Sequence, residues 1–368
     1  MAFRNNCYFS SLILLLSLLH FQLSNAVKGG YFSPGNNLEA SDIDSTLFTH
    51  LFCAFASFDG STNQLTLPSG CTNFPRIVKQ KNPDVQAVLS IGGGEDAPTK
   101  AFIAMASNPS SRKTFIDSSI KLAVDNGFNG LDMDWEQQQT QEEMDNMAAL
   151  LSEWRAAIQA QSATEPLLLT AALRFTAKAD TGVPFPAQAI ADNLDWVNAM
   201  AYDFYAPQWA PKPYVTRPHA SLRDPSSDVS GSSGISAWIN AGVPANKLVL
   251  GLPFYGYAWI LSNANDNGVL ATATGGDTSF GEQSTVTYKR IKEFISQNGA
   301  TVKYDSSYVT NYCNSGTTWI GYDDTESITQ KVLYAKNSAS ILGYFAWNIV
   351  QDSDWILSKQ ASQTWGDE

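Results

Sequence analysis

Short runs of apolar residues recur along the chain, and stretches with the spacing of amphipathic helices lie between them. A strand buried on both faces is apolar throughout, whereas a strand with one solvated face alternates. The runs here are of the first kind, and eight of them predict β-strands: Lys28–Phe32, His50–Phe58, Gln86–Ile91, Gly130–Glu136, Leu167–Phe175, Trp196–Tyr202, Lys247–Pro253 and Ile341–Trp347. The intervening pattern predicts helices at Ser111–Asn126, Gln141–Gln159, Ser232–Ala241, Tyr288–Gln297 and Ser327–Lys336.

The order of these elements predicts one barrel with an insertion. Eight buried strands with helical crossovers in a single chain are typical of a (β/α)8 TIM barrel, which is an α/β fold. The stretch between the seventh and eighth strands is too long for one helix. Its residues, Trp259–Asp323, are polar and rich in Thr, Gly and Tyr, and they include strand-like pieces of their own. We therefore expect a small α+β insertion at about residues 259–323, beside the mouth of the barrel.

The first 26 residues have the pattern of a cleaved secretory signal. Arg4 gives a positive start, an apolar run extends from Leu12 to Leu19, and small residues end the segment at Ser24-Asn25-Ala26. The apolar run is too short to span a bilayer. We therefore expect a mature chain of residues 27–368 that is secreted or sent to the vacuole and has no membrane partner.

Composition and charge exclude several classes of protein. The 368 residues are 44% hydrophobic and 16% charged, which excludes a disordered chain. The net charge of −12 disfavours nucleic acid and anionic membranes as partners. The three cysteines after the signal, Cys53, Cys71 and Cys313, leave at least one thiol unpaired in the monomer that we expect. We predict no cofactor and no metal site, because no His/Cys cluster has the spacing of metal ligands.

The most informative segment is the acidic strand that ends in Asp132, Asp134 and Glu136. Alternate side chains of a strand share a face, so these three carboxyl groups lie in line. In a barrel strand that face is the interior, near the rim where active sites lie. Like charges at such short range raise one or more pKa values, so that a proton is shared. The alternative is a solvated surface strand, but Phe128 and Trp135 indicate burial. A protonated carboxyl beside a carboxylate is what a glycosidase requires.

This strand resembles the DxxDxDxE signature of glycoside hydrolase family 18, the chitinases. Other segments resemble further motifs of that family, in order along the chain: the SxGG strand at Val88–Gly93, the M-x-Y-D strand at Met200–Asp203 and the last strand at Gly343–Trp347. Two segments near the start, Gly29–Phe32 and Thr49–Ala56, are similar to the plant class V branch. The resemblance covers Val27 to about Trp365 and implies a plant class V chitinase or a chitinase-like protein.

The resemblance implies a retaining mechanism in which the N-acetyl group of the substrate is the nucleophile. By position, Glu136 would protonate the glycosidic oxygen, and Asp134 would orient the acetamido nitrogen and stabilise the oxazolinium ion. Asp132 would hold the proton that lets Asp134 change partner. Tyr202 would donate a hydrogen bond to the acetamide oxygen, and Asp203 would bind the sugar at the cleavage subsite. Further residues are expected to contact substrate, with Trp347 as the floor: Trp347, Tyr31, Phe55, Met200, Trp259 and Arg223.

Several positions depart from the family pattern. Asn129 stands at the first acidic position, and Gln137 and Gln138 follow the acid where Tyr-Pro is usual. Arg174 and Arg223 occupy places where related plant sequences tend to have an aromatic residue. An arginine beside Glu136 would favour its carboxylate form and weaken it as an acid. Alternatively, each arginine binds sugar hydroxyls or faces outward.

These departures leave three functions open. The first is a chitinase that cleaves β-1,4-linked N-acetylglucosamine chains, with chitin or chito-oligosaccharides as its partners. The second is a chitinase-like lectin that binds such sugars without cleaving them. The third is a barrel put to other use, such as storage or inhibition. The intact acidic strand and Tyr202 favour the enzyme. His50 and His219 have no positioned partner in the sequence and are expected to be packing residues.

Overall fold

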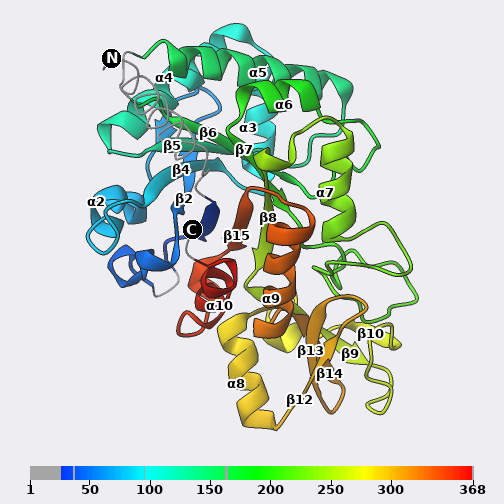
Figure 1. Cartoon of the computed structure of the whole chain (residues 1–368). Coiled ribbons are helices and arrows are strands. Elements are labelled where there is room, and N and C mark those ends of the chain that lie inside the picture. The colour runs from blue at the N-terminus through cyan, green and yellow to red at the C-terminus, as the bar shows by residue number, and fades with distance from the viewer. Residues whose placement is uncertain (1–25, 36–37, 95, 162–164, 367–368) are drawn as a thin grey trace, which may run out of the picture.

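The computed structural model describes residues 26–35, 38–94, 96–161 and 165–366, and most of them surround one closed barrel (Figure 1). The barrel closes because β1 pairs in parallel with both its second and its last strand. Its eight parallel strands, in spatial order, are β1 (Val27–Phe32), β2 (His50–Phe58), β4 (Gln86–Gly92), β5 (Gly130–Asp134), β6 (Leu168–Arg174), β7 (Trp196–Met200), β8 (Leu248–Pro253) and β15 (Gly343–Trp347). The predicted barrel and its eight strands are confirmed. Residues 1–25 of the predicted signal lie outside the described residues.

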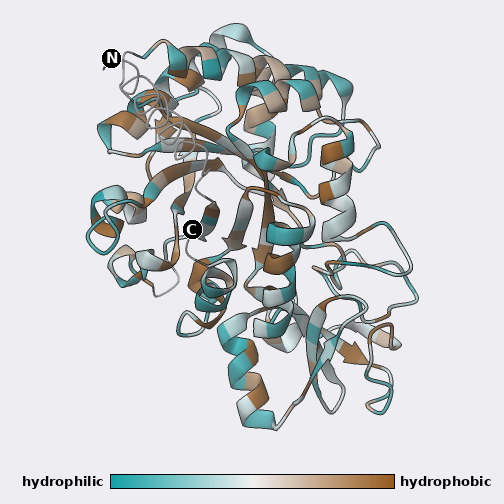
Figure 2. Ribbon diagram, in the orientation of Figure 1, coloured by the Kyte–Doolittle hydropathy of each residue, from teal (hydrophilic) through white to brown (hydrophobic). Residues whose placement is uncertain are grey.

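Helices pack around the outside of the barrel (Figure 1). They are α2 (Phe74–Val78), α3 (Asp96–Ala106), α4 (Pro109–Asp125), α5 (Gln141–Gln159), α6 (Ala187–Asn193), α7 (Gly231–Asn240), α9 (Thr325–Leu333), which a π-helical turn continues (Tyr334–Ser338), and α10 (Ile356–Trp365). Short 3-10 turns connect several elements: Ala40–Asp42, Ser45–Leu47, Ser69–Cys71, Ala245–Lys247, Thr278–Phe280 and Ile349–Gln351. In Figure 2 the barrel strands are largely brown, whereas the helices around them carry both brown and teal residues. The core therefore lies in and around the strands, as expected for amphipathic helices packed on a barrel.

Helix α5 shows why some helices are readable from the sequence. The side chain of Thr140 accepts a hydrogen bond from the backbone N–H of Glu143, and the Glu143 carboxylate accepts one from the N–H of Thr140. This capping box marks the first turn. The residues that α5 buries recur every three or four positions: Met144, Met147, Leu150, Leu151, Trp154 and Ile158. By contrast, α6 has seven residues and no side-chain cap, and the pattern does not predict it.

A second, antiparallel sheet occupies the chain between β8 and α9, in the lower part of Figure 1. Its elements are β9 (Tyr255–Leu261), β10 (Ala273–Gly276), β11 (Thr285–Thr287), α8 (Tyr288–Asn298), β12 (Thr301–Asp305), β13 (Thr310–Ser315) and β14 (Thr318–Tyr322). The first strand, β9, starts only two residues after the end of β8. Tyr255 and Tyr257 therefore belong to this second sheet while remaining close to the ends of the barrel strands.

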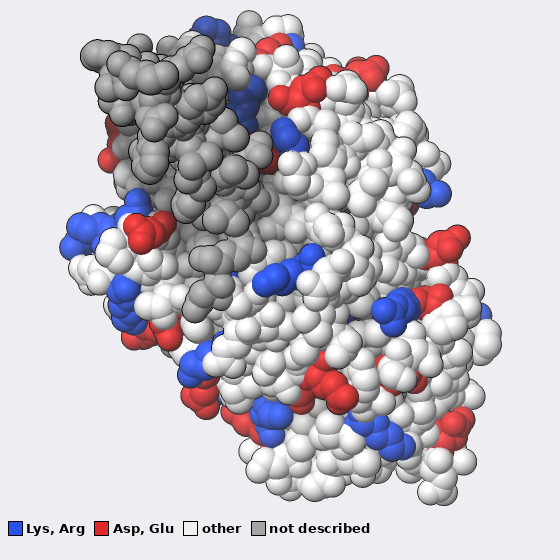
Figure 3. Space-filling view, viewed as in Figure 1, with Lys and Arg blue, Asp and Glu red and all other residues white. Residues whose placement is uncertain are grey.

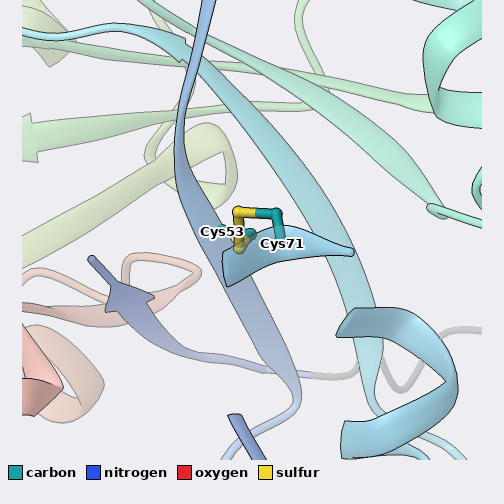
Figure 4. Close-up of a disulfide and its surroundings, with 2 residues drawn as sticks. All are labelled: Cys53 and Cys71. Carbon is teal, nitrogen blue, oxygen red and sulfur yellow. A yellow bond between two sulfur atoms is a disulfide. The ribbon is translucent and has the colours of Figure 1, made fainter. Parts of the chain in front are cut away.

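One disulfide ties the start of the barrel to the loop that follows it. Cys53 in β2 is bonded to Cys71 in the 3-10 turn Ser69–Cys71 (Figure 4). The two cysteines are 18 residues apart, and closing a loop of this size stabilises a fold by about 3 kcal/mol. Cys313 is a buried free thiol in β13.

The surface in Figure 3 is mostly uncharged, and acidic and basic side chains are interspersed over it. Over the described residues of this face, no extended field of a single sign is visible. Within the described ranges, none of the helices is long and apolar enough to cross a lipid bilayer.

Candidate active site

A cavity of about 890 Å³ opens at the C-terminal ends of the barrel strands. This is the end of a barrel at which active sites are built, because the loops after the strands converge there. Eight of the sequence-predicted site residues line it: Tyr31, Phe55, Asp134, Glu136, Met200, Tyr202, Asp203 and Trp347. The fold thus brings together residues from most of the chain, from Tyr31 to Trp347.

Asp132 lies beneath this cavity and has no solvent exposure. Three hydroxyl groups donate hydrogen bonds to its carboxyl oxygens: Tyr31 at 2.9 Å, Ser90 at 2.7 Å and Thr170 at 2.6 Å. Burial raises the pKa of Asp132, and these three hydrogen bonds act in the opposite direction. The Asp132 side chain is therefore fixed in one orientation below Asp134, and three neutral hydrogen-bond donors offset part of the cost of burying its carboxylate.

Asp134 and Glu136 form a hydrogen-bonded pair of carboxyl groups. Burial is the main cause that raises the pKa of Glu136, to about 6, and the negative charge of Asp203 adds to it. Burial also raises the pKa of Asp134 well above its ordinary range, with further contributions from the charges of Glu136 and Asp132. Asp134 Oδ1 is buried and has no hydrogen-bond partner among the described residues. The pair is therefore arranged to share a proton near neutral pH.

A run of glycines after β4 supports the end of the acidic strand. The backbone N–H of Gly93 donates to the carbonyl oxygen of Asp134 at 2.9 Å. A Cβ on Gly92, whose φ is +115°, would lie 2.2 Å from that same oxygen. A Cβ on Gly94 would lie 2.6 Å from Glu136 Oε1. Glycine is thus required at position 92, where the backbone of β4 approaches the backbone of Asp134 too closely for any side chain.

Tyr202 and Asp203 follow β7 and also line the cavity. Burial and the charge of Asp134 raise the pKa of Tyr202, so its hydroxyl stays protonated and is a hydrogen-bond donor. Asp203 has a left-handed φ of +60°. Its Oδ1 accepts hydrogen bonds from the hydroxyls of Tyr255 at 2.6 Å and Tyr257 at 3.0 Å. Two tyrosines of the second sheet therefore hold an aspartate of the barrel in an uncommon backbone conformation.

Aromatic side chains form the floor and the inner wall of the cavity. The rings of Phe55 and Trp347 are 5.6 Å apart, and Tyr31 meets Trp347 edge-on at 5.4 Å. Tyr31, which was expected to contact substrate, is only 1% exposed, and its ring stacks on Phe52 at 4.4 Å. Because its hydroxyl also bonds Asp132, Tyr31 supports the acidic strand from below instead.

Two predicted substrate-binding residues lie elsewhere. Trp259 has no exposed surface, because it continues β9 into the interior of the second sheet and pairs in register with Trp319 of β14. Arg223 is exposed and does not line the cavity. Its positive charge acts instead to lower the pKa of Tyr304 and of Tyr334. The prediction for Trp259 was wrong, since the alternation along a strand does not reveal which of two sheets covers its far end. The prediction for Arg223 placed it at the cavity, but the loop after β7 carries it outside the lining residues.

The residues near Glu136 that depart from the family pattern do not pair it with an arginine. Arg174 lines the cavity, but Asp180 holds its guanidinium through contacts of 2.6 and 3.2 Å. Gln137 has a left-handed φ of +66° and donates to the carbonyl oxygen of Gly94 at 3.1 Å. The buried side chain of Gln138 donates to the carbonyl oxygen of Trp135. These residues shape the loop after the acid and contribute no charge to it.

Asn129 takes no part in the cavity. Its side-chain oxygen accepts a hydrogen bond from Lys79 Nζ at 2.9 Å and another from the backbone N–H of Ala87 at 3.0 Å. It therefore ties the start of the acidic strand to β4, at the end of the barrel remote from Glu136.

Residues 28–352 match the family model described as glycosyl hydrolases family 18. The chain belongs to this family. It is 47% identical to a class V chitinase from Arabidopsis thaliana, over 96% of this chain and 94% of the relative.

Solved structures of family 18 proteins agree with this assignment. A mutant class V chitinase from Nicotiana tobaccum in complex with NAG4 has a TM-score of 0.89 and 48% identity, and the match covers 93% of this chain and 99% of that chain. A chitinase-like agglutinin from Robinia pseudoacacia also has 48% identity, with a TM-score of 0.85 and coverage of 93% and 100%. Overall identity is therefore the same to a class V chitinase as to a chitinase-like agglutinin.

Sequence reasoning missed Trp209, which lines the cavity of this family 18 protein with 54% of its surface exposed. Its ring meets Tyr257 edge-on at 6.0 Å. A large exposed indole at the rim of a cleft is a surface on which a pyranose stacks. The available signal was a lone tryptophan in a polar loop after a barrel strand.

The cavity contains no evident place for a metal. Among the described residues, no group of three or more His, Cys, Asp or Glu side chains is arranged to hold a metal ion.

Proposed function

We propose that this chain is a secreted chitinase that hydrolyses β-1,4-linked N-acetylglucosamine chains with retention of configuration. The observation that carries the proposal is the state of Glu136. Its carboxyl group lies in the cavity with a pKa raised to about 6, hydrogen-bonded to Asp134. The guanidinium of Arg174, which also lines the cavity, pairs with Asp180, and it is not among the groups that act on the pKa of Glu136.

Glu136 has the properties of the general acid in this reaction. A group with a pKa of about 6 is about nine-tenths protonated at pH 5. It can therefore give its proton to the glycosidic oxygen as the bond to the anomeric carbon breaks. The same residue, once ionised, takes a proton from the water that completes hydrolysis.

Asp134 serves the nucleophile, which is the acetamide oxygen of the substrate itself. After protonation of the leaving group, the acetamide nitrogen gains positive charge, and an adjacent carboxylate stabilises it. Asp134 Oδ1 is buried and has no hydrogen-bond partner among the described residues, so it offers an acceptor for that N–H. Asp132, directly below, takes over the proton of Asp134 when Asp134 turns from Glu136 toward the sugar.

The remaining cavity residues hold the sugar. Trp347 presents its half-buried ring as the floor, Tyr202 donates to the acetamide oxygen, and Asp203 accepts from a sugar hydroxyl. Met200 and Trp209 extend the contact surface along the cleft. Secretion rests on the pattern of residues 1–26.

A second candidate is a lectin that binds chito-oligosaccharides without cleaving them. The equal identity to the Robinia pseudoacacia chitinase-like agglutinin favours it. The lectin retains the floor and the walls of the cleft but requires no protonated Glu136.

The deciding experiment combines binding and product analysis in one sample. Chitotetraose is titrated into the protein by calorimetry at pH 5, and the sugar is then analysed by chromatography that resolves anomers. We expect heat of binding followed by shorter oligosaccharides, with the β-anomer formed first. Heat of binding with intact sugar after a day would contradict the proposed hydrolysis and support the lectin function instead.

A further inference from the structure

His219 lies in the loop between β7 and α7 and is 2% exposed. Its Nε2 is 3.1 Å from the backbone carbonyl oxygen of Tyr255, within hydrogen-bond distance. Its Nδ1 is 3.5 Å from Oδ1 of Asp203 and has no hydrogen-bond partner among the described residues. A carboxylate and a carbonyl are both hydrogen-bond acceptors and have no hydrogen to give. Each ring nitrogen of this buried histidine therefore faces an oxygen that can only accept.

Only one protonation state places an N–H, and not a lone pair, toward both oxygens. A neutral imidazole carries a single N–H, so in either tautomer the other nitrogen would point a lone pair at an acceptor in a buried site, which is unfavourable. An imidazolium donates from both nitrogens. We infer that His219 is an imidazolium in the resting protein and is a positioning residue that holds Asp203 and balances its charge.

The other groups around the ring support this assignment. From β9, the rings of Tyr255 and Tyr257 lie 5.0 and 5.1 Å from the imidazole. Both are neutral donors, because burial and the charge of Asp203 raise their pKa values. Asp203 is therefore the carboxylate that the imidazole faces.

The neighbouring cations are already paired with other acids. On α9, Lys331 contacts the carbonyl oxygen of Ala220, next to His219, and pairs with Asp323. On the same loop, Arg217 lies over the ring of Tyr205, with Asp224 at 3.9 Å. Each of these neighbouring cations has an acidic partner, so none of them disfavours a positive charge on His219 by repulsion.

The consequence for catalysis passes through Asp203 and rests on the proposed function. The negative charge of Asp203 is one cause that raises the pKa of Glu136. A cation on the far side of Asp203 offsets part of this charge. His219 therefore limits how far the pKa of the acid rises and fixes the aspartate that binds the sugar.

His50 is a matched control within the same chain. It is also buried, but Nδ1 faces the hydroxyl of Thr49 at 2.9 Å, which can either donate or accept. Burial lowers the pKa of His50 to about 4, so it is neutral at pH 6. The two histidines should therefore differ in charge at that pH.

The first test measures protonation directly and requires no activity. The secreted protein is labelled with 15N in its histidine rings, and the nitrogen shifts are recorded at pH 6. Signals are assigned with the variants His50→Gln and His219→Gln. We expect two protonated nitrogens for His219, and one protonated and one bare nitrogen for His50. An unprotonated nitrogen on His219 at pH 6 would overturn the inference. If His219→Gln does not fold, His50→Gln alone suffices to assign the signals of the two histidines.

The second test compares pH profiles of kcat/KM on chitotetraose. For His219→Gln we expect a loss of about tenfold from misplacement of Asp203. Its alkaline limb should move to higher pH, because Asp203 loses its counter-charge and raises the pKa of Glu136 further. His50→Gln should keep the parent profile. If the alkaline limb of the His219→Gln profile stays in place, or moves to lower pH because water enters the space left by the ring, His219 has a packing role only. A parent without hydrolysis would refute the proposed function, whereas the nitrogen shifts would still decide the charge of His219.

Discussion

Two buried charged clusters in this protein are built in opposite ways. At the end of β5 and two residues beyond it, the carboxyl groups of the buried Asp134 and the half-buried Glu136 lie with a third acid, Asp132, and among the described residues no cation contributes to their pKa values. Where α9 meets the loop after β7, Lys331 is also buried, but the carboxylate of Asp323 and the carbonyl oxygen of Ala220 contact its ammonium.

The difference separates a reactive group from a structural one. The uncompensated carboxyl groups of β5 can lower their energy only by holding a proton, which makes them an acid. The pair of Lys331 and Asp323 balances its own charge, although Asp323 Oδ1 has no hydrogen-bond partner among the described residues, and it ties α9 to the loop of His219. Burial of charge is therefore a sign of catalysis only where no partner compensates it.

The largest expected effect is the loss of hydrolysis in Glu136→Gln. The amide keeps the shape of the acid but has no proton to give, so kcat on chitotetraose should fall by about 1,000-fold or more. Binding, measured by calorimetry, should stay close to that of the parent. Glu142→Gln, the same change at an exposed position of α5, is the control and should cleave normally. Cleavage by Glu136→Gln at the parent rate would show that another group is the acid.

Breaking the compensated pair should reduce stability instead. Lys331→Met leaves the buried carboxylate of Asp323 without its partner, so the free energy of unfolding should fall by about 3–5 kcal/mol. Replacing both residues with Lys331→Met and Asp323→Leu should recover most of this loss. Urea unfolding at pH 7 measures both. A single variant as stable as the parent would mean that the pair contributes nothing to the fold.

The uncompensated cluster should lower stability at high pH. The pKa of Glu136 is about 1.5 pH units above its unfolded value of about 4.5, so the folded state holds its proton more tightly. The protonated group stabilises the fold at low pH, and this contribution is lost as the pH rises through 6. Glu136→Gln should therefore be about 2 kcal/mol more stable than the parent at pH 8. The gain should disappear toward pH 4. Urea unfolding at pH 8 and at pH 4 measures it, and an equal gain in the free energy of unfolding at both pH values would contradict the prediction.

The smallest effect concerns the ion pair in the cavity wall. Asp180→Asn removes the carboxylate that neutralises Arg174, so the free guanidinium should lower the pKa of Glu136 by a few tenths of a unit. The alkaline limb of kcat/KM should then move to lower pH. The double variant Arg174→Gln with Asp180→Asn changes no net charge and should restore the parent limb. An unchanged limb in Asp180→Asn would place Arg174 out of range of Glu136.

The barrel and its acidic strand were predictable because their signals are local. A doubly buried strand is apolar along its whole length, and α5 carries both a capping box and a periodic stripe. The line of Asp132, Asp134 and Glu136 follows from the two-residue repeat of one strand. These features depend on neighbours in sequence, so the chain itself reveals them.

The sequence by itself thus determined the strands, the main helices and the line of three carboxyl groups, and it also supplied the motifs of the family. Only the tertiary structure decided that Trp259 is interior, that Asp180 engages Arg174, and that His219 faces Asp203 and Tyr255. These outcomes depend on contacts between segments far apart in the chain, among them the loop after β7 and the first strand of the second sheet. Because burial and charge balance arise from such contacts, no periodicity along a single segment encodes them.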